Sequence, residues 1–179
     1  MSDLDRYLDA FDFALASHGL ARRKSGVRLA MTHPIAVVEI LRRAGVHDTE
    51  ILCAALLHDV IEDAAVKYDA LEERFGAAVA DLVVECSDDN RLPREARRAA
   101  QLAHAPRMSP GAKWIKLADL AANLGELAQH RPVGWDEART AAFRAHCARL
   151  LERLGGSHAA LEGMVTEALA LSPTSRAAR

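Results

Sequence analysis

The chain has 179 residues, which suits one domain with a sizeable core and is short for two ordinary domains. Half of the residues are hydrophobic, with 36 alanines and 23 leucines among them, while only 4% are aromatic. This composition favours helices, because strands are enriched in β-branched and aromatic residues. Lys and Arg number 23 against 25 Asp and Glu, so no basic field attracts nucleic acid or an anionic membrane.

The three cysteines, Cys53, Cys86 and Cys147, are odd in number and far apart in the chain. They argue against a disulfide scaffold and a zinc ribbon, both of which need paired cysteines, and they favour a reducing compartment. No apolar run approaches the roughly 20 residues that span a bilayer, and none has the placement of a signal peptide. We therefore expect a cytoplasmic protein whose partners include neither nucleic acid nor a membrane.

Cap and breaker residues divide the chain into a series of predicted helices. Thr32 and Ser109 are expected N-caps, and each is followed in the first turn by a proline, where the missing N–H costs nothing. In chain order, the expected helices cover residues 3–17, 32–44, 48–63, 68–75 and 77–87, a segment from Pro93, residues 109–130 and 135–154, and a last segment after residue 157. We expect an all-α fold, a single compact bundle of about eight to ten helices over residues 1–172, followed by a disordered tail at 173–179.

The third predicted helix carries four ionisable groups directly after an apolar run. His58, Asp59, Glu62 and Asp63 follow Ala54–Leu57, and a helix that is apolar on every face is buried. Buried charged groups are costly unless they are paired or bind a metal, and carboxylates near a helix C-terminus oppose the helix dipole. The spacing aligns His58 with Glu62 and Asp59 with Asp63. A solvated helix end is the competing interpretation.

Two residues in other predicted helices complete a possible set of metal ligands. His33 stands at the start of the second helix, and Asp119 lies among apolar residues in the long helix. Two imidazoles and two carboxylates suit a borderline-hard divalent ion that keeps positions open for water. Such an ion polarises a phosphoryl oxygen and lowers the pKa of water, which leaves Glu62 and Asp63 to transfer protons. The residues expected to support the ligands or to contact substrate are Asn123 and Lys116.

The order of His33, the doublet His58–Asp59 and the distant Asp119 resembles the H…HD…D motif of the HD-domain phosphohydrolases. Other motifs resemble the hydrolase domain of the RelA/SpoT family, in particular its stand-alone small alarmone hydrolases of the metazoan SpoT homologue type. These motifs are Arg23–Lys24, His33–Pro34, Ala54–Asp63, Phe75–Gly76, Ser109–Asn123, Gly134–Trp135 and Arg139. The resemblance covers roughly residues 4–165.

The resemblance implies a 3′-pyrophosphohydrolase that uses one divalent metal ion, typically Mn²⁺, to remove pyrophosphate from the ribose 3′ position of the guanosine alarmones (p)ppGpp. The implied metal ligands are His33, His58, Asp59 and Asp119. The pair that positions and activates the attacking water falls on Glu62 and Asp63. The implied substrate contacts are Arg23 and Lys24 at the purine, Asn123 at the sugar-phosphate and Arg139 near the phosphates.

The chain departs from the family pattern at positions expected to lie near the nucleotide. The differing residues are Leu29–Ala30, Ala64, Leu120, Gly125 and Phe143, and none of them is an implied metal ligand. An adenosine counterpart, (p)ppApp, is therefore an alternative substrate, because hydrogen bonds to exocyclic groups decide base choice. The sequence is also compatible with a phosphatase of another phosphorylated ribonucleotide such as NADPH, and with a nucleotide-binding module without turnover.

Six further histidines have no partner that the sequence identifies: His18, His47, His104, His130, His146 and His158. We expect each of them at an exposed position or a helix end rather than among the metal ligands. Because the chain ends soon after the last predicted helix, we also expect no synthetase domain and a stand-alone degrading role.

Overall fold

The computed structural model describes residues 2–172, and within this range the regular elements are ten α-helices and one short 3₁₀ helix. The predicted all-α fold is therefore confirmed, whereas the predicted tail at 173–179 lies outside the described residues. The helices are α1 (Asp3–His18), α2 (Thr32–Arg43), α3 (Thr49–Leu57), α4 (Val60–Ala64), α5 (Tyr68–Phe75), α6 (Ala77–Cys86), α7 (Arg94–His104), η1 (Ala105–Arg107), α8 (Pro110–Gln129), α9 (Glu137–Leu154) and α10 (Ala159–Ala170).

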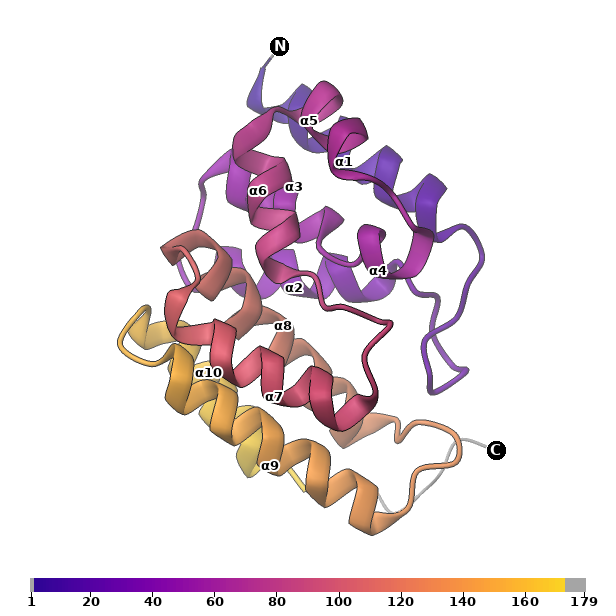
Figure 1. Ribbon diagram of the computed structural model, residues 1–179, viewed down its shortest axis with the longest axis vertical. Helices are drawn as coiled ribbons and strands as arrows, with labels where there is room; N and C mark the ends of the chain where they lie inside the picture. The colour runs from indigo at the N-terminus through magenta and orange to yellow at the C-terminus, as the bar shows by residue number, and fades with distance from the viewer. Residues whose placement is uncertain (1, 173–179) are drawn as a thin grey trace.

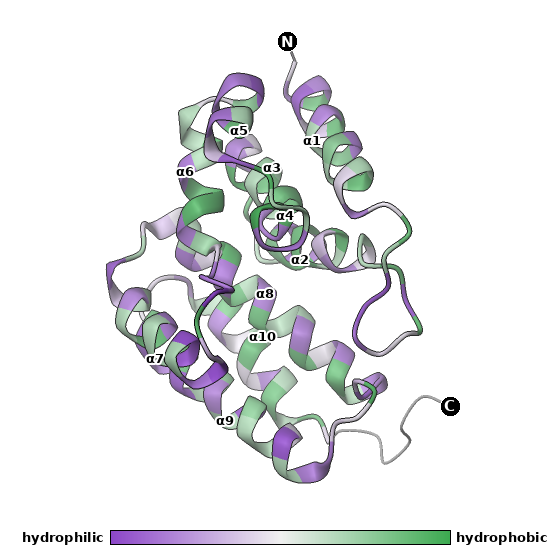
Figure 2. Cartoon of the chain, turned by 45° about the vertical axis from the view of Figure 1, so that its right-hand side comes forward, coloured by the Kyte–Doolittle hydropathy of each residue, from purple (hydrophilic) through white to green (hydrophobic). Residues whose placement is uncertain are grey.

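The long helix α8 lies between two groups of helices (Figure 1). Helices α1 to α6 occupy one side of it, and α7, α9 and α10 occupy the other. Its closest packing is against α2 and α10, and it also contacts α3, α6 and α9. Figure 2 shows that α3 is largely hydrophobic, whereas hydrophilic residues recur along α7 and α9. Because α8 runs through the core, a polar side chain on its buried face is held among several helices.

Local capping explains where several helices begin. Ser2 forms a capping box with Asp5, and the Asp48 carboxylate accepts hydrogen bonds from the first turn of α3. Ser109 caps α8 ahead of Pro110, as predicted. The prediction for Thr32 is wrong, because Thr32 is the first residue of α2 and its hydroxyl donates to the carbonyl of the preceding turn at 2.7 Å.

The predicted helix over residues 48–63 is interrupted in its second half. Helix α3 ends at Leu57 and α4 begins at Val60, with His58 and Asp59 in the turn between them. Asp59 has φ −98° and ψ −6°, a sparsely populated conformation in which many active-site residues are found. The interruption means that the predicted helical alignment does not apply to His58 and Glu62, whereas the Asp63 N–H still donates to the Asp59 carbonyl at 2.8 Å.

The segment between α1 and α2 folds back over α8. Arg22 and Leu29 form an isolated antiparallel bridge, and the Arg23 N–H donates to the Arg28 carbonyl at 2.9 Å. The Lys24 carbonyl accepts a hydrogen bond from the Val133 N–H at 3.0 Å, which ties this segment to the loop before α9. Among residues 2–172, none of the helices combines the length and the apolar composition needed to cross a bilayer.

Candidate metal centre

Side chains from α2, the α3–α4 turn and α8 meet in the core. His33, His58 and Asp119 are buried, and each offers one ligand atom that lies within 4.8 Å of the other two. His33 Nε2 is 3.0 Å from Asp119 Oδ1, and His58 Nε2 is 3.9 Å from the same oxygen. The Asp59 carboxylate is 3.3 Å from His58 Nε2 and 3.7 Å from His33 Nε2. The structure thus gathers the four residues predicted as metal ligands.

The tautomer of His58 decides whether this cluster fits a cation. His58 Nδ1 lies 2.8 Å from the Ala55 carbonyl oxygen, which can only accept, so Nδ1 carries the proton. In the neutral ring Nε2 then presents its lone pair, and this atom is buried without a hydrogen-bond partner among the described residues. The lone pair faces the oxygens of Asp59 and Asp119, and a divalent cation would convert that repulsion into coordination. The donor set fits a metal ion.

The charges around Asp119 keep it ionised. Although burial raises the pKa of its carboxyl group, the hydrogen bond from His33 and the Lys116 ammonium lower it far below its usual range. Lys116 Nζ lies 3.6 Å from Asp119 Oδ2, and its side chain is only 13% exposed. Burial would lower the pKa of the Lys116 amine, but the Asp119 carboxylate raises it above its ordinary value. Asp119 is thus an anionic ligand candidate beside a fixed positive charge.

Glu62 lies one turn beyond Asp59, in α4, and points to a different neighbour. Its Oε1 accepts a hydrogen bond from the Asp88 N–H at 2.8 Å, and the Asn90 amide donates to its carbonyl oxygen at 3.3 Å. Burial raises the pKa of Glu62 to about 7, and the Asp88 carboxylate adds to this rise while the hydrogen bond from the Asp88 N–H opposes it. Glu62 can therefore gain or lose a proton near neutral pH.

Asp63 turns the other way, toward α1. Its side chain is 57% exposed, and its Oδ2 lies 3.9 Å from Nδ1 of His18. His18 was expected at an exposed position or a helix end, and the second alternative is confirmed. It does end α1, but it is buried, and its Nε2 has no hydrogen-bond partner among the described residues. Burial lowers the pKa of His18, while the carboxylates of Asp59 and Asp63 oppose this shift, so His18 belongs to the surroundings of the cluster.

A second polar network joins the segment between α1 and α2 to α8. The Arg23 guanidinium donates to Asn123 Oδ1 at 2.7 Å, and the Asn123 amide donates to Asp119 Oδ1 at 2.5 Å. Arg23 Nε also pairs with Glu126 at 2.8 Å, and the Ser25 hydroxyl donates to the other oxygen of Glu126 at 3.2 Å. Two predicted substrate residues, Arg23 and Asn123, are therefore linked to a predicted metal ligand.

Glu126 and His18 were not predicted as neighbours of the centre, although their spacing offered a signal. Asp119, Asn123 and Glu126 are separated by four and three residues, which places them on one face of α8. For His18 the corresponding signal is the run Ala10, Ala14 and His18, which marks the buried stripe of α1 at intervals of four residues.

The other predicted substrate residues lie outside these hydrogen bonds. The Lys24 side chain is exposed beside the loop that precedes α9. Arg139 is exposed at the start of α9, where its guanidinium stacks on the Trp135 ring at 4.8 Å from the ring centre. No contact between Arg139 and the cluster is found among residues 2–172. The Trp135 ring in turn packs edge-on against Phe143 at 5.5 Å.

The family follows from a comparison of the whole chain with known proteins. The model of the HD domain family matches residues 10–143, which include the four clustered side chains. This chain belongs to the HD-domain family. The predicted resemblance to the metazoan SpoT homologues is also confirmed, because the chain is 41% identical to mouse and human proteins of this kind.

These relatives are similar to the chain over nearly their whole length. The mouse and human proteins, each named guanosine-3′,5′-bis(diphosphate) 3′-pyrophosphohydrolase MESH1, align over 163 residues, 90% of this chain and 91% of the relative. The bifunctional (p)ppGpp synthase/hydrolase SpoT of Escherichia coli K12 is 36% identical over 72% of this chain but only 19% of its own. A solved metazoan orthologue of SpoT, described as hydrolysing ppGpp, superposes with a TM-score of 0.88 at 34% identity, covering 91% of this chain and 93% of its own.

Proposed function

We propose that this chain is a metal-dependent 3′-pyrophosphohydrolase of purine nucleotide alarmones, (p)ppGpp or (p)ppApp, carried by residues 1–172 as one domain. The observation that carries the proposal is the buried cluster of His33, His58 and Asp119, with Asp59 beside it, in a chain of the HD-domain family. The names of the relatives, which cover 90% of the chain, support the substrate class. We further infer a cytoplasmic location, where the three buried free thiols stay reduced.

The ligand set indicates what kind of ion the centre would hold. His33, His58, Asp59 and Asp119 provide imidazole nitrogens and carboxylate oxygens and no thiolate, a set that suits Mn²⁺. When bound, such an ion would polarise a phosphoryl oxygen and make water easier to deprotonate. The Lys116 ammonium beside Asp119 limits the net negative charge of the pocket that must also admit phosphates.

Proton transfer is the part that we assign to Glu62 and Asp63. Glu62 Oε1 is occupied by the Asp88 N–H, which leaves Oε2 to take a proton from the water that attacks the phosphorus. The bond between this phosphorus and the ribose 3′ oxygen then breaks, and the proton passes to that oxygen as pyrophosphate leaves. A carboxyl group whose pKa is near 7 suits both directions of transfer. Asp63, on the same short helix, turns toward His18, so its assignment to orienting the water is taken from the resemblance to the family.

Substrate contacts are assigned to basic and amide groups around this centre. Arg23 and Asn123 form a hydrogen-bonded pair next to Asp119, which suits them to hold the sugar-phosphate and the purine together. Lys24 and Arg139 are exposed cations on the segments that flank the pair, and we assign them to the purine and the phosphates. The planar guanidinium groups of Arg23 and Arg139 can stack on a ring and bind phosphate oxygens in pairs, whereas Lys24 offers a point charge.

The decisive experiment compares nucleotides side by side. Purified protein is incubated with Mn²⁺ and with ppGpp, ppApp or NADPH in parallel, and pyrophosphate and orthophosphate are measured separately. The proposal predicts pyrophosphate from ppGpp, from ppApp or from both. Orthophosphate from NADPH alone would instead favour a phosphatase of that nucleotide. Tight nucleotide binding with metal bound and no turnover would identify a binding module and overturn the proposal.

A further inference from the structure

A line of hydrogen bonds connects Glu62 with the opposite side of the molecule. The Asp88 N–H donates to Glu62 Oε1 at 2.8 Å, and the Gln101 amide donates to the Asp88 carboxylate. His146 Nε2 lies 2.6 Å from Gln101 Oε1. These contacts join α4, the loop between α6 and α7, α7 itself and α9. The expectation that His146 is exposed or at a helix end is wrong, because His146 is buried in the middle of α9.

The hydrogen bonds of this line have one direction. A carboxylate only accepts, so the NH₂ group of Gln101 must face Asp88 and its oxygen must face His146. The proton between Gln101 and His146 is then on His146 Nε2. Burial lowers the pKa of His146 to about 4, with the charges of Arg98 and Arg149 adding to the effect, so the ring is neutral at pH 7. Each donor in the line therefore points toward Glu62.

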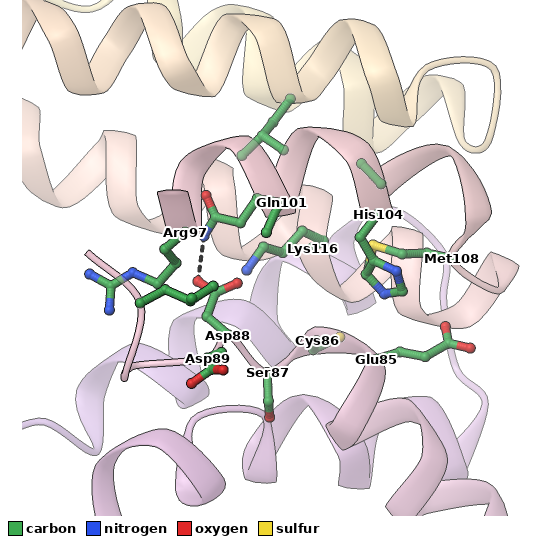
Figure 3. Close-up of a pocket in the computed structure, with 14 residues that line it drawn as sticks. Glu85, Cys86, Ser87, Asp88, Asp89, Arg97, Gln101, His104, Met108 and Lys116 are labelled. Atoms are coloured by element: carbon green, nitrogen blue, oxygen red, sulfur yellow. Dashed lines mark hydrogen bonds between the residues drawn. The ribbon is translucent and has the colours of Figure 1, made fainter. Parts of the chain in front are cut away.

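The two residues in the middle of this series of hydrogen bonds, Asp88 and Gln101, border a cavity rather than tightly packed side chains. Asp88 and Gln101 line a cavity of about 220 Å³ between the end of α6, α7 and α8, together with Arg97 and Lys116. Figure 3 shows the bond between Gln101 and Asp88 across one wall, with the Lys116 side chain reaching toward Asp88 from α8. Because little packing supports the Asp88 segment on this side, its position depends on its hydrogen bonds.

We propose that Gln101 and His146 are positioning residues that fix Asp88 and, through its N–H, hold the Glu62 carboxylate in place. The inference rests on the proposed function for its catalytic consequence. Arg97 of α7 also donates to Asn90 Oδ1 of this loop at 2.6 Å, two residues away. Without the Gln101 bond, the loop after α6 loses the bond from α7 that acts on Asp88 itself, and the N–H that orients Glu62 Oε1 is no longer fixed. Displacement of a reacting group by about 1 Å costs roughly 100-fold in rate, while binding of metal and nucleotide depends on other residues.

The test uses Gln101→Glu, which keeps the shape of the side chain and the acceptor facing His146 but places a carboxylate against Asp88. We expect kcat for the alarmone to fall roughly 10- to 100-fold, with KM and the Mn²⁺ affinity within about twofold of wild type. Hydrogen exchange of the Asp88 amide should become faster. His104→Gln is the matched control, since His104 lines the same cavity from α7 and takes no part in the line; it should leave every quantity unchanged.

A second pair of variants guards against loss of folding in Gln101→Glu. His146→Phe removes the donor and should lower kcat, whereas His146→Gln retains an N–H donor and should recover most of it. Unchanged kcat and unchanged Asp88 exchange in both Gln101→Glu and His146→Phe would overturn the inference. A wild-type protein without pyrophosphate release would refute the proposed function instead, and the exchange of the Asp88 amide would still test the anchoring by Gln101.

Discussion

Two carboxyl groups within the centre have opposite properties because their neighbours differ. Asp119 is buried beside His33 and Lys116, and these cationic or donating groups lower its pKa far enough to keep it charged. Glu62 has an N–H donor but no cation in contact among the described residues, so burial raises its pKa to about 7. The first environment suits a permanent metal ligand, and the second suits a group that exchanges protons during a reaction. The division of roles that we propose follows from this contrast.

This division can be tested with one substitution of each kind. His58→Ala removes a ligand atom and should abolish both Mn²⁺ binding and pyrophosphate release. Glu62→Gln keeps the size of the side chain and the acceptor for the Asp88 N–H, so the metal should bind as in wild type. Its turnover should fall roughly 100-fold or more, because the proton acceptor is lost. Calorimetric titration with Mn²⁺ and steady-state kinetics give the two readouts, and loss of metal in Glu62→Gln would contradict the assignment.

At the scale of helices, capping residues and hydrophobic periodicity predicted most of the fold. The helix boundaries and contacts that they did not predict have physical causes. Ser109 and Pro110 marked the start of α8 correctly, because cap chemistry is local. The break after Leu57 was missed, since Ala54–Asp63 contains no glycine or proline that would mark it. Gln101 could not be recognised as a partner of Asp88, because their contact depends on how α7 packs on α9 and how the loop after α6 meets it.

Helix α8 offers a matched pair of glycines for testing how tightly it is packed. A Cβ on Gly125 would meet no atom within 4 Å, so Gly125→Ala should raise the free energy of unfolding by roughly 0.5–1 kcal/mol through helix propensity. A Cβ on Gly111 would lie 3.0 Å from Leu82 Cδ2 and 3.4 Å from Ile51 Cγ1. Overpacking costs about 1–3 kcal/mol, so Gly111→Ala should be destabilising. Urea unfolding of both variants measures the difference, and equal stabilisation by the two would show that α8 can move away from α3 and α6.

For the whole molecule, the buried His146 links stability to pH. Its pKa is about 4 in the folded protein and about 6.5 when unfolded, so the unfolded state binds the extra proton between these values. The contribution of His146 is fully present above pH 6.5 and is lost as the pH falls toward 4, by about 1–2 kcal/mol after allowance for solvent screening. His146→Gln should flatten this part of the curve of unfolding free energy against pH. An identical slope in wild type and His146→Gln would mean that folding leaves the pKa of His146 at its ordinary value.

The metal ion would connect parts of the chain that are far apart in sequence. Its proposed ligands come from α2, the α3–α4 turn and α8, so an ion bound only by the folded state must stabilise the molecule as a whole. At a free Mn²⁺ concentration 100-fold above Kd, the gain is about 2.7 kcal/mol. For a chain of this size, that corresponds to a rise in Tm of roughly 5–10 °C, which a chelator should reverse. Asp119→Ala should abolish this shift, and Glu62→Gln should retain it, because the one removes a ligand and the other does not. If Mn²⁺ raised the Tm of Asp119→Ala as much as that of wild type, the ion would be bound elsewhere and the cluster would lose its assigned role.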